Sequence, residues 1–160
     1  MHSRIFQLSK EPIAKDDYIT EHHYYDDWFT REIADYVDDD TDRIEDIEWL
    51  KSCASGVEFD TDEHGEYLII KNREQYFEKS FQMFRKYLEE INRQNTLKDF
   101  ANGINGMWSL NAAHEDKFGF YVDFTMDADR YSDLVTFDNF MRTSKDGEKY
   151  YIGATIDYHW

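Results

Sequence analysis

The chain has 160 residues, a length typical of one domain, and we expect residues 1–160 to form a single globular unit. Aromatic residues make up 18% of the chain, which excludes a disordered protein despite the high charge. The net charge of −17 opposes direct binding to nucleic acid or to an anionic membrane, and no apolar run reaches the roughly 20 residues of a membrane-spanning helix.

The N-terminal part of the chain predicts a strand followed by a helix. Residues 4–9 are expected to form a short strand. Residues 24–37 predict a helix, because Phe29, Ile33 and Val37 recur at helical spacing, with Tyr36 beside them. Acidic residues at the start of this segment suit the positive end of a helix dipole.

A second helix is expected over residues 42–52. Asp42 can cap it, and Glu45, three residues further on, completes a capping-box pattern. The apolar residues of this helix are expected to face inward: Ile44, Ile47 and Leu50. Its acidic residues are expected to face outward: Glu45, Asp46 and Glu48.

The rest of the chain continues with a hairpin and further helices. Residues 56–71 alternate apolar and polar side chains around a turn at Gly65, which predicts a β-hairpin. Residues 73–93 carry an apolar stripe at spacings of three and four and predict a long helix. Four shorter elements are expected: a helix at 96–100, a strand at 118–124, a helix within 133–142 and a strand at 149–160.

Strands and helices do not alternate strictly, which favours an α+β fold over a parallel α/β fold. We expect a mostly antiparallel sheet of about five strands, with helices packed on one face.

The negative charge is concentrated in one segment. Residues 16–66 contain 19 Asp or Glu and only three Lys or Arg, a balance of −16. Solubility does not require such segregation, because interspersed charges also serve it. A concentrated negative field attracts basic partners and repels nucleic acid.

Two stretches of this segment partly match a calcium-binding loop, and neither completes the pattern. In residues 60–71 the position that needs a bidentate Glu is Lys71. In the stretch that starts at Asp38, Arg43 and Trp49 occupy the positions of the required Gly and Glu. The histidines show no metal-ligand spacing, and we expect no metal and no cofactor.

No sequence signature of catalysis is present. There is no nucleophile elbow, no phosphate-binding glycine loop and no second cysteine beside Cys53, which we expect to be a packed thiol in a reducing, cytosolic compartment. The first residues contain no apolar segment typical of a signal peptide. A pair of carboxylates could still act as acid and base, but the sequence does not single out two among 35.

Residues 18–29 mix aromatic and acidic side chains. Aromatic residues are enriched at protein interfaces and supply many of their hot spots. Tyr24 and Tyr25 cannot both point the same way, so at least one is expected to meet solvent or a partner. Phe29 is expected in the core, and Trp28 could lie in the core or at an interface.

Carboxylates three or four residues apart on a helix lie about 5–6 Å from each other. Duplex DNA carries one negative charge per roughly 1.7 Å of its axis. The stretch DDWFTREIADYVDDDTDRIEDIEW (26–49) therefore resembles the acidic surfaces of small DNA mimics from phages and mobile elements, which include antirestriction and anti-CRISPR proteins. SRIFQLSKEPI and YYIGATIDYHW also look like uncharacterised proteins of bacterial mobile elements.

The leading hypothesis is a non-enzymatic inhibitor that occupies the basic, nucleic-acid-binding surface of a nuclease or other DNA-binding protein. Two alternatives remain: an acidic interaction module for a basic partner unrelated to nucleic acid, and an enzyme with a carboxylate site. A soluble domain whose acids serve only hydration is an equally strong interpretation. The predicted partner-binding residues are Asp26, Asp27, Glu32, Asp35, Asp38, Asp39, Asp40, Asp42, Glu45, Asp46, Glu48, Tyr24, Tyr25 and Trp28.

Overall fold

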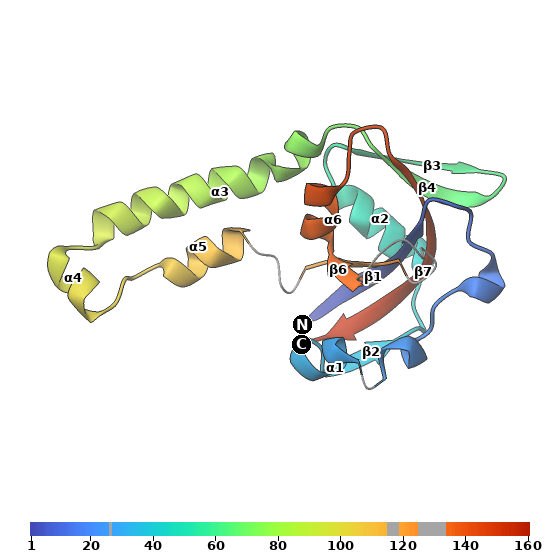
Figure 1. Ribbon diagram of the computed structural model, residues 1–160, viewed down its shortest axis with the longest axis horizontal. Coiled ribbons are helices and arrows are strands. Elements are labelled where there is room, and N and C mark those ends of the chain that lie inside the picture. The colour runs from blue at the N-terminus through green and yellow to red at the C-terminus, as the bar shows by residue number, and fades with distance from the viewer. Residues whose placement is uncertain (26, 115–118, 125–133) are drawn as a thin grey trace.

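The computed structural model describes residues 1–25, 27–114, 119–124 and 134–160 (Figure 1). Its strands are β1 (His2–Ser9), β2 (Tyr36–Asp38), β3 (Val57–Asp62), β4 (Gly65–Ile70), β5 (Tyr121–Asp123), β6 (Leu134–Thr136) and β7 (Lys149–His159). Its α-helices are α1 (Trp28–Glu32), α2 (Arg43–Cys53), α3 (Arg73–Gln94), α4 (Leu97–Asn102), α5 (Met107–His114) and α6 (Phe137–Thr143). Two short 3-10 helices, η1 (Lys15–Asp17) and η2 (Glu21–Tyr24), follow β1.

The strands form one mixed sheet in the order β3-β4-β7-β1-β5-β6, with β2 also paired to β7. β7 runs antiparallel to β1, β2 and β4, whereas β1 and β5 run parallel. The α+β class is confirmed, but the expectation of about five mostly antiparallel strands is wrong. Three strands, β2, β5 and β6, have only three residues each, too few to show a hydrophobic period.

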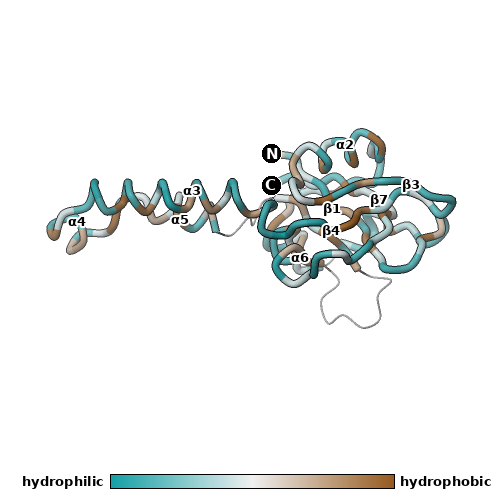
Figure 2. Tube along the Cα trace, turned by 90° about the horizontal axis from the view of Figure 1, so that it is seen from above, coloured by the Kyte–Doolittle hydropathy of each residue, from teal (hydrophilic) through white to brown (hydrophobic). Residues whose placement is uncertain are grey.

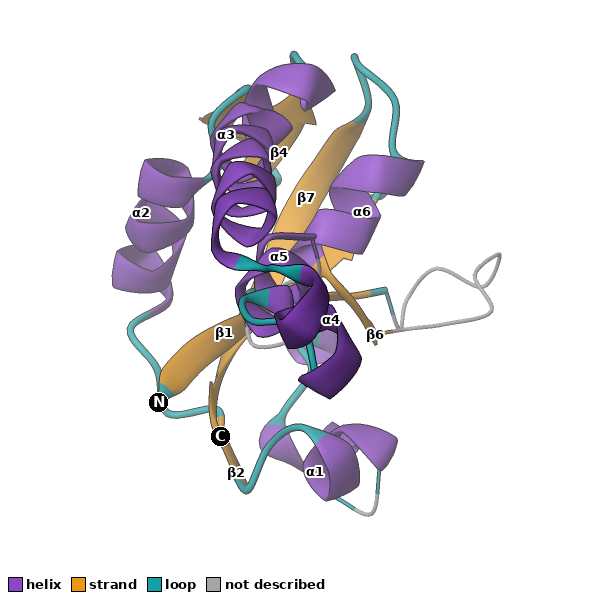
Figure 3. Ribbon diagram, turned by 90° about the vertical axis from the view of Figure 1, so that its left-hand side faces the viewer, coloured by secondary structure: helices purple, strands orange, loops and turns teal. Residues whose placement is uncertain are grey.

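Helices cover both faces of the sheet, so the expectation of one covered face is wrong. Neighbouring residues of a strand point to opposite faces, and in β1 Phe6 belongs to one buried cluster and Ile5 to another. The first cluster includes apolar residues of α2 and α6, and the second includes Phe29 of α1. Figure 3 shows α2 and α6 on either side of α3, with α1 near β2 at the opposite end of the sheet.

An irregularity in the pairing of β1 with β7 lets β7 contribute apolar side chains to both buried clusters. The register shifts between Phe6 and Leu8, so that Leu8 lies opposite Ile152 on one side of the shift and Ile5 lies opposite Ile156 on the other. Ile152 belongs to the first cluster and Ile156 to the second, although both are even-numbered residues of one strand. The shift therefore turns the apolar side of β7 from one face of the sheet to the other.

Gln7 and Gly153 form the centre of this irregularity. The side chain of Gln7 is fully buried, and its amide oxygen accepts hydrogen bonds from the backbone N–H groups of Ile19 and Ala154. Its amide nitrogen donates to the carbonyl of Asp17. A Cβ at position 153 would lie 2.4 Å from the Gln7 oxygen, so this contact requires glycine.

The helix predicted over residues 24–37 is wrong. Among the described residues of this range, only those of α1 are α-helical. Asp27 caps its start by accepting a hydrogen bond from the N–H of Phe29. After α1 the chain becomes extended, because the N–H of Asp35 donates to the carbonyl of His159 and β2 then pairs with β7. Pairing of Tyr36 with His159 and of Asp38 with Asp157, far along the chain, overrides the local helical spacing.

α2 is confirmed as a helix, but its inward face differs from the prediction. Asp42 caps it through the N–H groups of Ile44 and Glu45. Ile47 and Leu50 are buried as expected, whereas Ile44 is 70% exposed. Asp46 takes the inward place and is 3% exposed, so the expectation that it faces outward is wrong.

Residues 73–114 form a helical arm that projects from the body of the protein (Figures 1 and 2). α3 leaves the body, α4 forms the tip and α5 runs back beside α3, and no residue of α3 is buried. The long helix is confirmed, but of its apolar stripe only Phe77 packs against a buried cluster of the sheet. α5 was not predicted.

The other predictions fare as follows. The strand at 4–9 is confirmed within β1, the hairpin at 56–71 as β3 and β4, the short helix at 96–100 as α4 with Thr96 as its cap, and the strand at 149–160 as β7. The strand expected at 118–124 begins at Tyr121 in β5, and residue 118 lies outside the described residues. The segment 133–142 contains β6 as well as α6, and residue 133 is not among those described. Cys53 is exposed, so the expectation of a packed thiol is wrong.

Candidate partner-binding surface

Two strands that carry parts of the acidic segment, β4 and β2, pair with the same edge of β7. β1 pairs with the opposite edge, so β4 and β2 share this one, with β4 opposite residues 149–151 and β2 opposite residues 157–159. Between them, the guanidinium of Arg43 donates to the carbonyls of Ile152 and Gly153. At roughly 3.3 Å per residue, the β4 and β2 ends lie about 20 Å apart along the strand.

At the β4 end, cations compensate several acids. Asp62 accepts a hydrogen bond from the ammonium of Lys149 at 2.8 Å, and this contact is the main reason that the pKa of Asp62 falls to about 2. Glu66 pairs with Arg43 at 2.9 Å. Glu58 of β3 pairs with Lys71. The negative potential of the hairpin is therefore partly neutralised within the protein.

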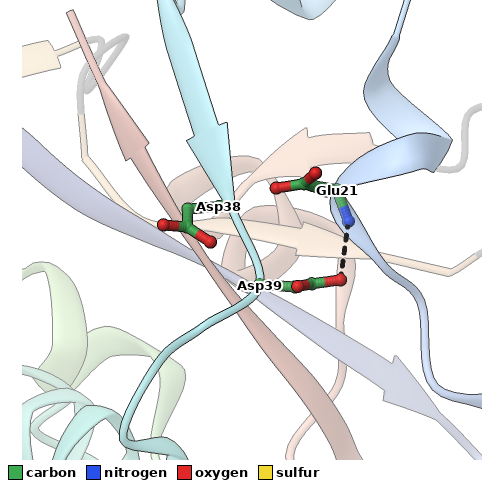
Figure 4. A group of neighbouring side chains, drawn as sticks. All are labelled: Glu21, Asp38 and Asp39. Atoms are coloured by element: carbon green, nitrogen blue, oxygen red, sulfur yellow. Dashed lines mark hydrogen bonds between the residues drawn. The ribbon is translucent and has the colours of Figure 1, made fainter.

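At the β2 end, three carboxylates converge without such compensation (Figure 4). Oxygen atoms of Glu21, Asp38 and Asp39 all lie within 4.8 Å of one another. Asp39 accepts a hydrogen bond from the backbone N–H of Glu21 at 3.3 Å. Among the described residues, no Lys or Arg forms an ion pair with any of the three, which leaves them free to attract an external cation.

Tyrosine hydroxyls extend this group. Tyr36 donates a hydrogen bond to Asp38 at 2.5 Å, and Tyr25 donates one to Glu21 at 2.5 Å. The hydrogen bond to Asp38, with partial burial and nearby negative charge, raises the pKa of Tyr36 to about 12. The hydrogen bond to Glu21 comes first among the causes that raise the pKa of Tyr25. Both hydroxyls therefore keep their protons at physiological pH and remain hydrogen-bond donors to these carboxylates.

A hollow of about 510 Å³ opens at the same place, lined by Glu21, Tyr25, Thr30, Asp35, Tyr36 and Val37. Asp35 at its rim accepts a hydrogen bond from the ring of His159 at 2.7 Å, and this bond is the main cause that lowers the pKa of Asp35. We define the β2 acidic surface as Glu21, Tyr25, Asp35, Tyr36, Asp38, Asp39 and Asp40.

The structure thus brings together a subset of the predicted binding residues. Tyr25, Asp35, Asp38, Asp39 and Asp40 belong to the β2 acidic surface. Asp27 and Asp42 cap helices, while Glu32, Glu45, Glu48 and Trp28 are exposed. Asp26 lies outside the described residues.

Two predicted residues lie inside the protein and are not accessible to a partner. Tyr24 is 2% exposed, and its hydroxyl donates to Asp123 at 2.7 Å. Asp46 accepts a hydrogen bond from the guanidinium Nε of Arg4 at 2.5 Å and another from the hydroxyl of Thr155 at 2.8 Å. Their inclusion in the predicted surface is wrong, because both are structural.

Two members of the surface, Glu21 and Tyr36, were not predicted. Tyr36 matched the helical spacing of residues 24–37 and was therefore expected to be buried, but it is 49% exposed on β2. Glu21 lies in the aromatic and acidic stretch 18–29, which was the one signal that could have nominated it. Its approach to Asp38 and Asp39 depends on η2, which the sequence did not reveal.

The described residues offer one group that could hold a divalent cation, namely Glu21, Asp38 and Asp39. Exposed carboxylates often cluster without binding a metal, so the absence of a metal site stays a prediction. Within the described ranges, every helix is too short or too polar to span a membrane. Comparisons with protein-family models, with curated proteins and with solved structures found no match to this chain.

Proposed function

We propose that this chain is a non-enzymatic inhibitor that occupies the basic, nucleic-acid-binding surface of a nuclease or another DNA-binding protein. The observation that carries the proposal is the convergence of Glu21, Asp38 and Asp39 within 4.8 Å, without a compensating Lys or Arg among the described residues. Like charges held this close repel one another, so a cationic partner relieves that repulsion when it binds.

The side chains around these three carboxylates favour a protein as the binding partner. Asp40 and Asp35 widen the negative patch, and both are exposed. Tyr25 is 54% exposed and Tyr36 is 49% exposed, so each offers a ring face as well as a hydroxyl already tied to a carboxylate. Arginine stacks on aromatic faces and binds carboxylates in the same approach, and surfaces that bind DNA are rich in arginine.

The mode of binding follows from the charge. Duplex DNA presents about one negative charge per 1.7 Å of axis, and a protein that binds it presents several cations at matching intervals. Adjacent carboxylates on β2 and the following loop can meet such cations. Association should be fast, and it should weaken as salt rises, because the Debye length is only about 8 Å at 0.15 M.

The test compares two variants with the same change in charge. In the first, four acids of the β2 acidic surface are neutralised by Glu21→Gln, Asp38→Asn, Asp39→Asn and Asp40→Asn. In the control, four acids of the helical arm are neutralised by Glu74→Gln, Glu78→Gln, Glu89→Gln and Glu90→Gln. Circular dichroism and urea unfolding establish that both variants fold.

The immobilised parent and variants are challenged with a bacterial lysate, and bound proteins are eluted with a short DNA duplex. We expect the parent and the control to retain a DNA-binding protein that duplex DNA displaces, and the first variant to lose it. Purified parent should then inhibit DNA binding or cleavage by that protein. Retention that survives the duplex would favour an interaction module unrelated to nucleic acid, and retention by the first variant would refute the role of these acids.

A further inference from the structure

The helical arm, residues 73–114, contains only two layers of helix. α3 has 22 residues and none of them is buried. Within a protein, a helix gains most of its stability from the packing of its apolar face. On the apolar face of α3, Phe77 packs against the first buried cluster, and Phe84 and Ile91 are half-buried. Phe81 and Leu88 are exposed, so part of this face lacks a packing partner among the described residues.

The arm is nevertheless a defined structure. Its turn is held by Asn95, whose side chain accepts a hydrogen bond from the N–H of Asn105 at 2.8 Å and donates to the Asn105 carbonyl at 3.1 Å. A Cβ at Gly106 would lie 3.0 Å from the side chain of Ile91, which shows how closely the returning chain approaches α3. At the root, Arg73 donates to the carbonyl of Ser144.

The arm exposes a large apolar area. Phe81, Phe100 and Trp108 are 56%, 68% and 82% exposed. At about 150–250 Å² for a whole aromatic side chain, these three contribute roughly 400 Å² per molecule. Further exposed apolar side chains of the arm add a comparable area: Met83, Leu88, Leu97, Ile104 and Met107. A standard interface buries about 800 Å² of each partner, so the combined apolar area of the arm, which lies on more than one side of it, is of the size that a dimer needs.

The charge of the helical arm indicates which binding partner fits its apolar surface. Residues 73–114 contain six Lys or Arg and five Asp or Glu, a balance of +1 in a chain whose net charge is −17. Two copies therefore repel each other through their bodies but not through their arms. α3 is about 33 Å long, several times the roughly 8 Å over which charges act at physiological salt.

We propose that the helical arm is the association surface between two copies of this chain, and that the arms pack antiparallel as a four-helix bundle. An antiparallel arrangement places the two acidic bodies at opposite ends of the bundle, whereas a parallel one brings them together. A two-fold axis makes the same patch serve both copies. Pairs of antiparallel helices with short connections commonly assemble into such bundles.

The root of the arm offers a place for the tip of the partner. A groove of about 200 Å³ lies between α3 and α5, lined mainly by Phe77, Phe81, Phe84 and Ala113. In an antiparallel pair centred near Leu88, the exposed Leu97 and Phe100 at the tip of one arm approach this groove in the other copy. In such a dimer, the tip of each arm fills the groove at the root of the other arm.

The first test measures the mass of the full chain by sedimentation velocity over a range of concentrations. We expect a concentration-dependent dimer of the 19.4 kDa chain. Phe81→Glu should weaken dimerisation at least about tenfold. The matched control is Ile44→Glu, which changes an apolar residue of the body that is 70% exposed. A parent that stays monomeric at its highest soluble concentration, or a dimer that Ile44→Glu weakens as much as Phe81→Glu, would overturn the proposal.

The second test fixes the orientation and does not depend on a destabilising variant. Cys53→Ser removes the native thiol, and Leu88→Cys or Phe100→Cys is then introduced singly. On mild oxidation, Leu88→Cys should form a covalent dimer near the two-fold axis, whereas Phe100→Cys at the tip should not. The reverse pattern would overturn the antiparallel arrangement. Added salt should change this dimer little, because the antiparallel arrangement holds the two bodies several Debye lengths apart, whereas salt should weaken binding of a basic partner.

Discussion

Asp46 gives the sharpest test of how the acids of this protein are used. It follows Glu45 on α2, and the sequence pattern predicts that both side chains face outward. In the structure Glu45 is exposed and Asp46 is buried. Asp46 accepts hydrogen bonds from Arg4 and Thr155. If the acids of α2 act mainly by mutual repulsion, neutralising either one should stabilise the protein. If Asp46 holds α2 to the sheet, its removal should destabilise it.

The magnitude follows from the contacts. Breaking a buried ion pair by removing one partner costs about 3–5 kcal/mol when the other charge is left alone. Here the side chain of Arg4 is 21% exposed and keeps a second ion pair with Asp157, which reduces the loss. The hydrogen bond from Thr155 contributes about 1 kcal/mol. Asp46→Ala should therefore lower the free energy of unfolding by roughly 2–4 kcal/mol.

The assay is urea unfolding at neutral pH, followed by tryptophan fluorescence, with Glu45→Ala as the control. Glu45→Ala should change the free energy of unfolding by no more than about 0.5 kcal/mol. Thr155→Val and the double variant complete a cycle that isolates the Asp46–Thr155 contact. An Asp46→Ala protein as stable as the parent, or more stable, would refute the structural role of this carboxylate.

Two further predictions concern the interior. Burial, followed by the charge of Asp123, raises the pKa of Tyr24 well above its usual value, so the stability that this tyrosine contributes is present below about pH 10 and is lost as the pH rises further. Tyr24→Phe should cost roughly 1–2 kcal/mol at pH 7, and the difference from the parent should shrink above pH 10 in urea unfolding; a constant difference would contradict this. Gly153→Ala should displace Gln7 and lower the free energy of unfolding by about 2–4 kcal/mol. Combined with Gln7→Ala, the loss of stability should be smaller than the sum of the two single losses. Additive losses would show that the two residues do not compete for the same space.

Elements with a long or distinctive local signal could be predicted from the sequence. α3 shows its apolar stripe over six turns, and the β3–β4 hairpin has alternating side chains around Gly65. β2 could not be predicted, because Tyr36 and Val37 fit a helical period and become a strand only by pairing with β7. Local pattern also does not reveal which acid of α2 meets Arg4, a residue 42 positions earlier.

The candidate surface was predictable in composition but not in position. The sequence shows that the acids are concentrated between residues 16 and 66. In the folded protein these acids lie in different environments. Two of them cap helices, one is buried, and three of the β3–β4 hairpin form ion pairs with Arg43, Lys71 or Lys149. At the β2 end, Glu21, Asp38 and Asp39 converge without an ion pair to Lys or Arg among the described residues. That division depends on contacts between distant parts of the chain, which charge counts cannot show.

The position of β7 has a consequence for how the protein is made. β7 follows in sequence every strand with which it pairs, and it alone connects β1, β2 and β4. During translation these three strands leave the ribosome before the strand that joins them, so the edges that pair with β7 stay unpaired until residues 149–159 emerge. Acids crowded into the early segment would then keep the nascent chain from aggregating, a benefit that ends when the sheet closes.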